Sequence, residues 1–95
     1  MPAYLIARVD IKDRDRYQEY LDIVPAIITK FGGKVIARSE EPVTFEGSDE
    51  SRRIILIQFS AMEKAREFYF SPEYQEARKL REDAATGEMV VVDGL

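Results

Sequence analysis

The sequence contains no cysteine and no histidine. Without cysteine the chain has neither a disulfide nor a thiol nucleophile, and without histidine it has no imidazole for general acid–base catalysis. Zinc sites built from nitrogen or sulfur ligands are excluded for the same reason. Any chemistry must therefore use Asp, Glu, Lys, Tyr, Arg or Ser, or a substrate that reacts largely by itself, and we expect neither a metal nor an organic cofactor.

The chain also lacks a strong excess of charge of one sign. Fourteen Lys and Arg stand against eighteen Asp and Glu, a net charge of −4 at pH 7, and the two signs are interspersed. Nucleic acids and anionic membrane surfaces both attract clustered basic residues, so we expect neither as a partner. No apolar run is long enough to cross a membrane, and the first residues indicate a strand rather than a signal peptide, which predicts a cytoplasmic protein.

The length and composition predict one domain over residues 1–95. Ninety-five residues, 45% of them apolar, are enough for one hydrophobic core and too few for two. The spacing of apolar residues and turn formers predicts the elements: a strand at 3–11, a helix from Asp13 to Gly32-Gly33, strands at 34–40 and 52–59, a helical region from Ser60 to about Gly87, and a strand at 89–93. This βαββαβ order is the ferredoxin-like α+β fold with an antiparallel sheet.

Local signals refine this outline. Pro25 lies in the apolar stripe of the first helix and predicts a kink or a break there. Ser60 and Glu63 have the spacing of a capping box that opens the second helix. Ser71-Pro72 divides the helical region and suits the start of a new helix. The polar loop at 41–51 contains the run Val43 to Glu46, for which an extra edge strand is predicted.

The alternation of side chains along the strands sorts them onto two faces of the sheet. One face collects only apolar residues, so we expect the helices to cover it: Leu5, Ala7, Val9, Ile11, Val35, Ala37, Ile55, Ile57, Phe59, Val90 and Val92. The other face collects Tyr4, Ile6, Ile36, Ile54, Leu56, Met89 and Val91, together with the polar residues Arg8, Asp10, Arg38, Gln58 and Asp93.

This second face is too apolar for a sheet surface in contact with water. A solvated face of an antiparallel sheet is normally polar, and soluble monomers rarely expose apolar patches above about a few hundred Å². The chain has no third layer to cover the face. We therefore predict a two-fold homodimer that packs sheet against sheet.

The chain contains a set of short motifs in this order: Asp13, Tyr17 and Tyr20; Phe31-Gly32-Gly33-Lys34 with Arg38; Glu46-Gly47; residues 54–60; Ser71-Pro72-Glu73-Tyr74-Gln75; Arg81; and Asp93-Gly94. Over nearly the whole chain this set resembles the small bacterial family called domain of unknown function 1330, in the dimeric α/β-barrel superfamily. The chain differs from many relatives at Ser39-Glu40, where they have glycines, and at Ser48 to Ser51, where they often have Trp and Pro.

The resemblance implies a βαββαβ fold and a dimeric α/β barrel, in which two sheets face one another. It implies no settled activity, because the family is named for lacking one. The wider superfamily includes cofactor-free monooxygenases, isomerases and haem enzymes. A fold alone does not choose among these activities.

Polar residues on the second face are the first candidates for a ligand site. Arg8, Asp10, Arg38 and Gln58 lie there beside apolar side chains. A guanidinium at an apolar wall binds a carboxylate or an enolate through two hydrogen bonds. The alternative is that Arg8 pairs with Asp10, and Arg38 with Glu46, in ion pairs that fix the register of the dimer.

Aromatic residues on the helices are the second group of candidates. Tyr17 and Tyr69 are placed to pack the ring or acyl chain of a ligand and to orient it through a hydroxyl. The alternative is ordinary packing between helices and sheet, since Tyr17, Tyr20 and Tyr74 all lie on apolar stripes.

Two functions follow from these observations. The first is an enzyme or binding protein for a small organic molecule, with Arg8, Arg38 and Glu46 holding its polar groups. The second is a non-catalytic dimeric module that binds another protein or has a structural role. The absence of His, Cys and any recognised catalytic spacing motivates the second.

Overall fold

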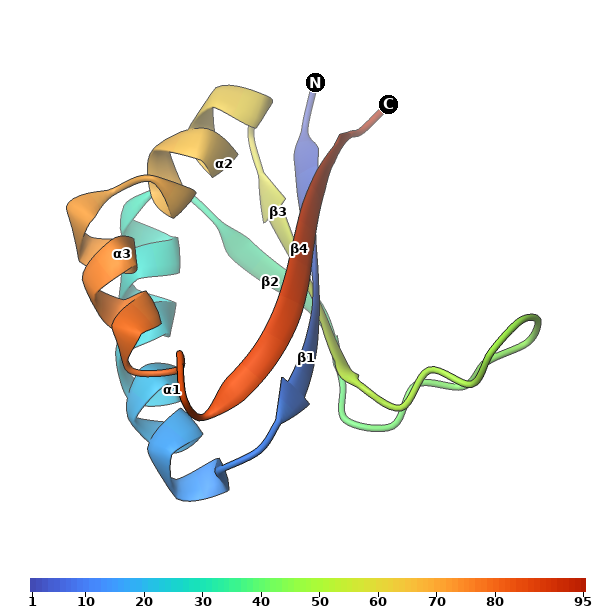
Figure 1. Cartoon of the computed structure of the whole chain (residues 1–95). Helices are drawn as coiled ribbons and strands as arrows, with labels where there is room; N and C mark the ends of the chain where they lie inside the picture. The colour runs from blue at the N-terminus through green and yellow to red at the C-terminus, as the bar shows by residue number, and fades with distance from the viewer.

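Seven elements follow one another in the computed structural model, which describes residues 1–95. They are β1 (Ala3–Ile11), α1 (Arg14–Lys30), β2 (Lys34–Ser39), β3 (Arg53–Phe59), α2 (Met62–Tyr69), α3 (Pro72–Lys79) and β4 (Ala85–Asp93). The strands form one antiparallel sheet in the order β2-β3-β1-β4. All three helices lie on one face of this sheet (Figure 1). The predicted ferredoxin-like α+β fold is confirmed, with two short helices between β3 and β4.

The apolar stripe of α1 holds this helix against the sheet. The Asp13 carboxylate caps it by accepting a hydrogen bond from the backbone N–H of Arg16 at 3.1 Å. The helix then runs without a break through Pro25, so of the predicted kink or break the break is not formed. Pro25 is itself exposed, whereas Val24 before it and Ile27 after it are buried. Packing on both sides of the proline therefore keeps the helix continuous.

The second helical region differs from its prediction at both ends. α2 begins after Ala61 without a side-chain cap, so the capping box at Ser60 and Glu63 is not formed. α3 is capped as its sequence indicates, because Ser71 Oγ accepts a hydrogen bond from the Tyr74 N–H at 3.1 Å. It ends at Lys79, and turns at 80–84 lead directly into β4. The last strand therefore starts at Ala85, four residues before the predicted Met89.

A β-bulge in β2 moves one arginine to the other face of the sheet. Val35 lies opposite Ile57 of β3, but after the bulge Ala37 lies opposite Leu56 and Arg38 opposite Ile55. The extra residue reverses the alternation of side chains. Arg38 consequently points to the helix side and Ala37 to the open side, the reverse of the sequence prediction.

The assignment of faces in β4 was also wrong. Val91 lies opposite Leu5 and Met89 opposite Ala7, so these two side chains pack against the core under the helices. Val90 and Val92 instead point to the open face and are 48% and 44% exposed. The run from Met89 to Val92 is apolar at every position, so its pattern does not reveal which face is buried. The pairing with β1 decides it.

The face of the sheet opposite the helices remains apolar after these corrections. On β1 and β3 it carries half-buried large side chains, and on β4 exposed valines: Tyr4, Ile6, Ile54, Leu56, Val90 and Val92. No element of the chain covers this face (Figure 1). No helix has the length and apolar character needed to span a membrane.

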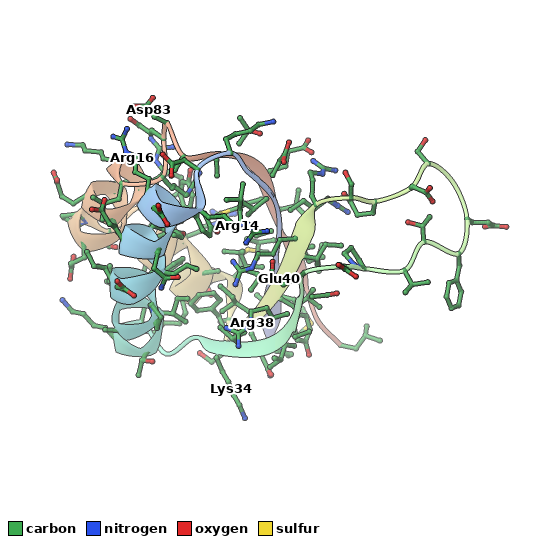
Figure 2. The ribbon with its side chains drawn as sticks, turned by 90° about the horizontal axis from the view of Figure 1, so that it is seen from below. Arg14, Arg16, Lys34, Arg38, Glu40 and Asp83 are labelled. Atoms are coloured by element: carbon green, nitrogen blue, oxygen red, sulfur yellow. The ribbon has the colours of Figure 1, made fainter.

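A long loop at residues 40–52 projects from the sheet away from the helices (Figures 1 and 2). It contains no strand, so the extra edge strand at Val43 to Glu46 is not formed. Its base is tied by Glu50, whose carboxylate accepts hydrogen bonds from Arg52 and lies 3.4 Å from Arg8 Nε. Hydrogen bonds from Arg52 hold the pKa of the Glu50 carboxyl below its ordinary value. Phe45 is 95% exposed at the far end of the loop.

The start of β2 leaves no space for a side chain at Gly33. A Cβ atom there would lie 2.8 Å from Ile28 Cγ2 and 2.8 Å from Phe59 Cε1. We expect Gly33→Ala to lower the free energy of unfolding by about 1–3 kcal/mol, the usual cost of overpacking a core. Urea denaturation measures this cost, and Thr29→Ala on the exposed side of α1 is the control, expected within about 0.5 kcal/mol of the parent. Equal stability of the two variants would contradict the close packing at Gly33.

Candidate functional site

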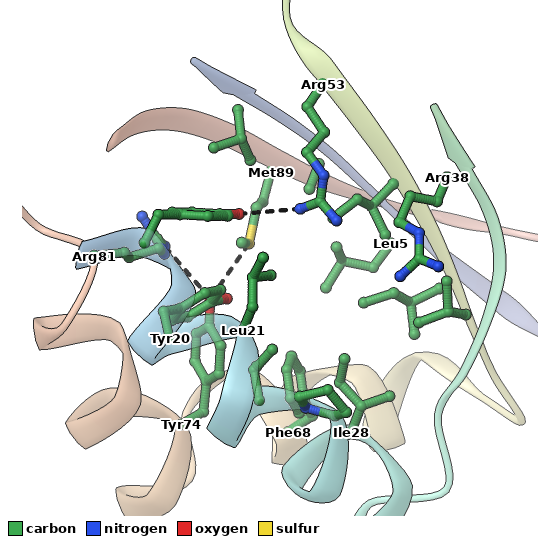
Figure 3. Close-up of a pocket in the computed structure, with 18 residues that line it drawn as sticks. Leu5, Tyr20, Leu21, Ile28, Arg38, Arg53, Phe68, Tyr74, Arg81 and Met89 are labelled. Atoms are coloured by element: carbon green, nitrogen blue, oxygen red, sulfur yellow. Dashed lines mark hydrogen bonds between the residues drawn. The ribbon is translucent and has the colours of Figure 1, made fainter. Parts of the chain in front are cut away.

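A narrow cavity of about 80 Å³ lies between the sheet and the helices. Fourteen of its eighteen lining residues are hydrophobic, and they come mainly from β1, β3 and α1. Its polar groups belong to a few large side chains (Figure 3): Tyr17, Tyr20, Arg38, Arg53, Tyr74 and Arg81. Apolar walls with a small number of placed polar groups are the usual construction of a small-molecule site.

Arg53 is the buried charge of this cavity, with only 6% of its surface exposed. It lies opposite Val9 in the sheet, in line with the core residues Ile55 and Ile57, so its side chain points under the helices. Its Nε lies 2.7 Å from the Glu40 carboxylate, and its Nη1 donates to the Tyr17 hydroxyl at 3.3 Å. The two partners offset the cost of taking the guanidinium out of water.

A second polar group in the cavity centres on the hydroxyl of Tyr74. The hydroxyls of Tyr20 and Tyr74 share a hydrogen bond of 2.9 Å, and Tyr74 also donates to Met89 Sδ at 3.9 Å. Arg81 Nη2 lies 3.4 Å from the Tyr74 hydroxyl, and the guanidinium stands over the Tyr20 ring, 5.6 Å from its centroid. These contacts tie the first turn of α3 and the turn that follows this helix to α1 and β4, across one side of the cavity.

The buried phenols stay protonated at neutral pH. Burial raises the pKa of Tyr17 above its ordinary value, although the nearby Arg53 opposes the change. Burial and the neighbouring Tyr74 together raise the pKa of Tyr20. These two hydroxyls are therefore hydrogen-bonding groups that position a ligand, rather than bases that remove a proton from it.

The charges that face the cavity are mainly positive. Arg53 has the carboxylate of Glu40 as its partner. Arg38 and Arg81 take part in none of the ion pairs of the structure. The bulge in β2 turns Arg38 toward the space between α1 and the sheet (Figures 2 and 3). The arrangement suits an apolar molecule with an anionic group, because an unpaired guanidinium can bind two oxygens at once.

Only two of the residues proposed from the sequence meet in this cavity, namely Tyr17 and Arg38. Arg8, Asp10 and Gln58 lie on the open face of the sheet instead, as predicted, but away from the cavity. Within the chain Arg8 is paired with Glu50 at 3.4 Å and Asp10 with Lys12 at 2.8 Å.

The remaining two proposed residues lie elsewhere. Glu46 is exposed in the projecting loop. Tyr69 is half-buried and accepts a hydrogen bond of 3.3 Å from Arg78 in a different cleft. The ion pairs Arg8–Asp10 and Arg38–Glu46 are both absent within the chain, which leaves their proposed role between two chains untested.

Sequence reasoning did not propose Arg53 or Arg81 as site residues. A signal for Arg53 was present, because this arginine has the same strand parity as Ile55, Ile57 and Phe59. A charged residue in register with a buried stripe indicates a buried charge, which needs a partner. Arg81 gave no such signal, since it lies in a turn whose path depends on where α3 ends. No group of acidic side chains comes together that could hold a metal ion.

Comparisons with known proteins support the fold. Residues 2–95 match the family model described as Domain of unknown function (DUF1330). A search of curated proteins finds no match. Among solved structures, a protein of unknown function from Rhodopseudomonas palustris, RPA0582, is similar with a TM-score of 0.80 at 19% identity, covering 99% of this chain and 82% of that one.

Two further solved structures are similar at low sequence identity. SnoaB, a cofactor-independent oxygenase from Streptomyces nogalater, has a TM-score of 0.71 at 8% identity over 99% of this chain and 93% of that one. A dimeric protein of unknown function with a ferredoxin-like fold from Bacteroides fragilis has a TM-score of 0.66 at 10% identity over 98% and 96%. At such identities the likeness shows the fold.

The buried tyrosines predict how the protein responds to alkali. Folding raises the pKa of Tyr17 and of Tyr20 above the unfolded value of about 10. Below about pH 10 both tyrosines are protonated in the folded and in the unfolded chain. Above it the unfolded chain loses these protons first, so the free energy of unfolding falls as the pH rises. An ultraviolet titration of the five tyrosines should show fewer than five ionising while the fold is intact, and the rest ionising as circular dichroism is lost.

Tyr17→Phe is the control for this titration. It should remove one late-ionising tyrosine and leave the early phase unchanged. If all five tyrosines ionise together in the folded protein, the burial of Tyr17 and Tyr20 described above is wrong.

Proposed function

This chain belongs to the domain of unknown function 1330 family, and we propose that it is a homodimer that binds a small organic acid in the cavity between sheet and helices. The observation that supports this most directly is Arg38, a guanidinium without an ion-pair partner among the mostly apolar side chains that line the cavity. In this proposal the site needs no metal and no organic cofactor.

The cavity favours a planar ligand with one charged end. Its tyrosine rings are suited to stack on a ring, and their protonated hydroxyls to hydrogen-bond a polar substituent. Arg38 would hold a carboxylate, a phenolate or an enolate through its two-pronged guanidinium. The small volume of about 80 Å³ limits the ligand to roughly one ring, unless α1 moves.

The fold is compatible with chemistry that uses no cofactor. SnoaB, which has the same fold, is a cofactor-independent oxygenase. If this chain transforms its ligand, the arginines would stabilise negative charge that develops on the substrate. The neutral phenols of Tyr17 and Tyr20 would orient the substrate without removing its proton.

The homodimer is supported by the open face of the sheet. Its half-buried side chains Ile6, Ile54 and Leu56 form the centre of an apolar surface that the chain does not cover. A two-fold axis would pack this surface against its own copy. The ferredoxin-like protein from Bacteroides fragilis is dimeric. The loop that carries Phe45 projects toward the side where the partner would lie (Figure 1).

Binding of small acids tests the cavity. Benzoate and its uncharged counterpart benzamide have nearly the same shape, so their comparison isolates the charge. We expect benzoate to bind more tightly than benzamide, and Arg38→Ala to weaken benzoate binding by roughly tenfold, the value of one charge-assisted hydrogen bond. Benzamide binding should change little. Ligand-detected NMR gives both affinities.

Arg16→Ala is the matched control, because Arg16 lies on the exposed side of α1 and pairs with Asp83 at 3.7 Å. This variant should bind benzoate as the parent does. Failure of a broad set of small acids to bind, or loss of binding that is equal in both variants, would count against the cavity as a site. A non-catalytic protein-interaction module would then be the better account.

The dimer is tested by a charge at the centre of the open face. Light scattering of the parent should give about twice the chain mass of 11.0 kDa. We expect Leu56→Lys to shift the protein to monomers, because two lysines would be buried near the two-fold axis without partners.

The control for this experiment is Ile23→Lys. Ile23 is also an exposed apolar residue, at 46%, but it lies on α1 away from the sheet. This variant should remain dimeric. A monomeric parent would refute the argument from the open face.

A further inference from the structure

A second cleft shares Leu5, Arg81 and Met89 with the first cavity and lies beside the edge strand β4. It encloses about 400 Å³ and is more open than the first cavity. Its apolar lining, here called its floor, consists of Leu5, Met89 and Val91 beside Gly87, and its polar lining of Tyr69, Arg78 and Arg81. We propose that this cleft binds a small organic oxyanion, a carboxylate or a phosphate monoester, between the guanidinium groups of Arg78 and Arg81.

The two arginines have no acidic partner. Neither takes part in an ion pair, although acidic residues are close to them in the sequence. Glu76 is paired with Lys79 at 3.1 Å, and Asp83 with Arg16 at 3.7 Å. Two like charges therefore line one cleft without an acidic partner, and an anion between them would relieve their repulsion.

Unsatisfied hydrogen-bond donors strengthen the case. The Nε atoms of Arg78 and Arg81 are both buried and have no hydrogen-bond partner. The partners that these guanidiniums do have are tyrosine hydroxyls: Tyr69 for Arg78 at 3.3 Å, and Tyr74 for Arg81 at 3.4 Å. A buried donor without a partner costs free energy. The Nη atoms of the two arginines are the donors nearest to an oxyanion in the cleft, and a rotation of either guanidinium would let its buried Nε–H join them in a two-pronged contact.

The end of α3 explains only part of this arrangement. A cation in the last turn of a helix is stabilised by the helix dipole. Lys79 lies in the same turn, is exposed, and already serves that role. With Lys79 at the end of α3, the helix dipole does not require a second cation there. The partly buried position of the Arg78 guanidinium therefore needs another reason. An anionic ligand supplies it.

The floor of the cleft indicates that the anion carries an apolar part. Met89 and Val91 point to the helix side of β4 and pack beside Leu5. A ligand whose charged end reaches the arginines would lay its remaining atoms on these three side chains. The two sites share Leu5, Arg81 and Met89, but Arg78 lines only the second cleft and Arg38 only the first cavity, so substitutions at these two arginines distinguish this inference from the proposed function.

Arginine side-chain NMR of the unmodified protein is the first test. Inorganic phosphate, acetate, phenyl phosphate and phenylacetate are titrated separately while the Nε–H signals are followed. We expect the signals of Arg78 and Arg81 to shift in a saturable way. The two phenyl compounds should bind several-fold more tightly than phosphate and acetate, because of the apolar floor. The stronger of the two phenyl compounds identifies the headgroup. Shifts that are equal for all arginines would overturn the proposal.

Arg78→Gln is the second test, with Arg66→Gln as the matched control. Arg66 occupies the last turn of α2, is exposed, and has no ion pair, so both variants lose one charge at the end of a helix. Arg78→Gln should weaken phenyl phosphate or phenylacetate by roughly tenfold or more, and Arg66→Gln by less than about twofold. An equal effect of both substitutions would show a general charge effect and refute the site. Arg38→Ala should leave the ligand-induced shifts of the Arg78 Nε–H signal unchanged, because Arg38 does not line this cleft.

Discussion

The sheet has two faces, and the chain supplies helices for only one of them. On the covered face, side chains such as Leu5, Phe59 and Phe68 are almost fully buried, each contributing about 1.5–3 kcal/mol to folding. The rest of the structure depends on this asymmetry. The covered face contains the core and the cavity, whereas the open face keeps an apolar surface that the chain cannot hide by itself.

The distribution of charge is as uneven as that of apolar surface. The chain as a whole has a net charge of −4, yet the charged residues that line the two cavities are all arginines. The acidic residues are used on the surface, where Glu50 binds Arg52 and Glu40 binds the outer side of Arg53. The net charge of a protein therefore does not determine the sign of the charge in its binding site, because the acidic residues can lie elsewhere or be neutralised by ion pairs. Anionic ligands suit these cavities despite the acidic composition.

The bulge in β2 connects the fold to the site. Strand pairing with β3 places Val35 under the helices, and one additional residue lets Arg38 point the same way three positions later. Without the bulge Arg38 would join Arg8 on the open face. Bulges are common beside functional sites because they redirect a side chain at little cost to the sheet. Because of the bulge, the guanidinium of Arg38 faces the cavity in place of the methyl group of Ala37.

The sequence by itself determined the element order, the antiparallel sheet, the cap at Asp13 and the buried stripe of α1, because these follow from local periodicity and turn chemistry. It also indicated an apolar second face. Only the tertiary structure decided which way Arg38 and Met89 point, since a bulge and a strand register depend on pairing with distant residues. The same holds for Arg53 and Arg81. Their partners, Tyr17 and Tyr74, are distant in sequence or reached through a turn, so no local pattern brings these side chains together.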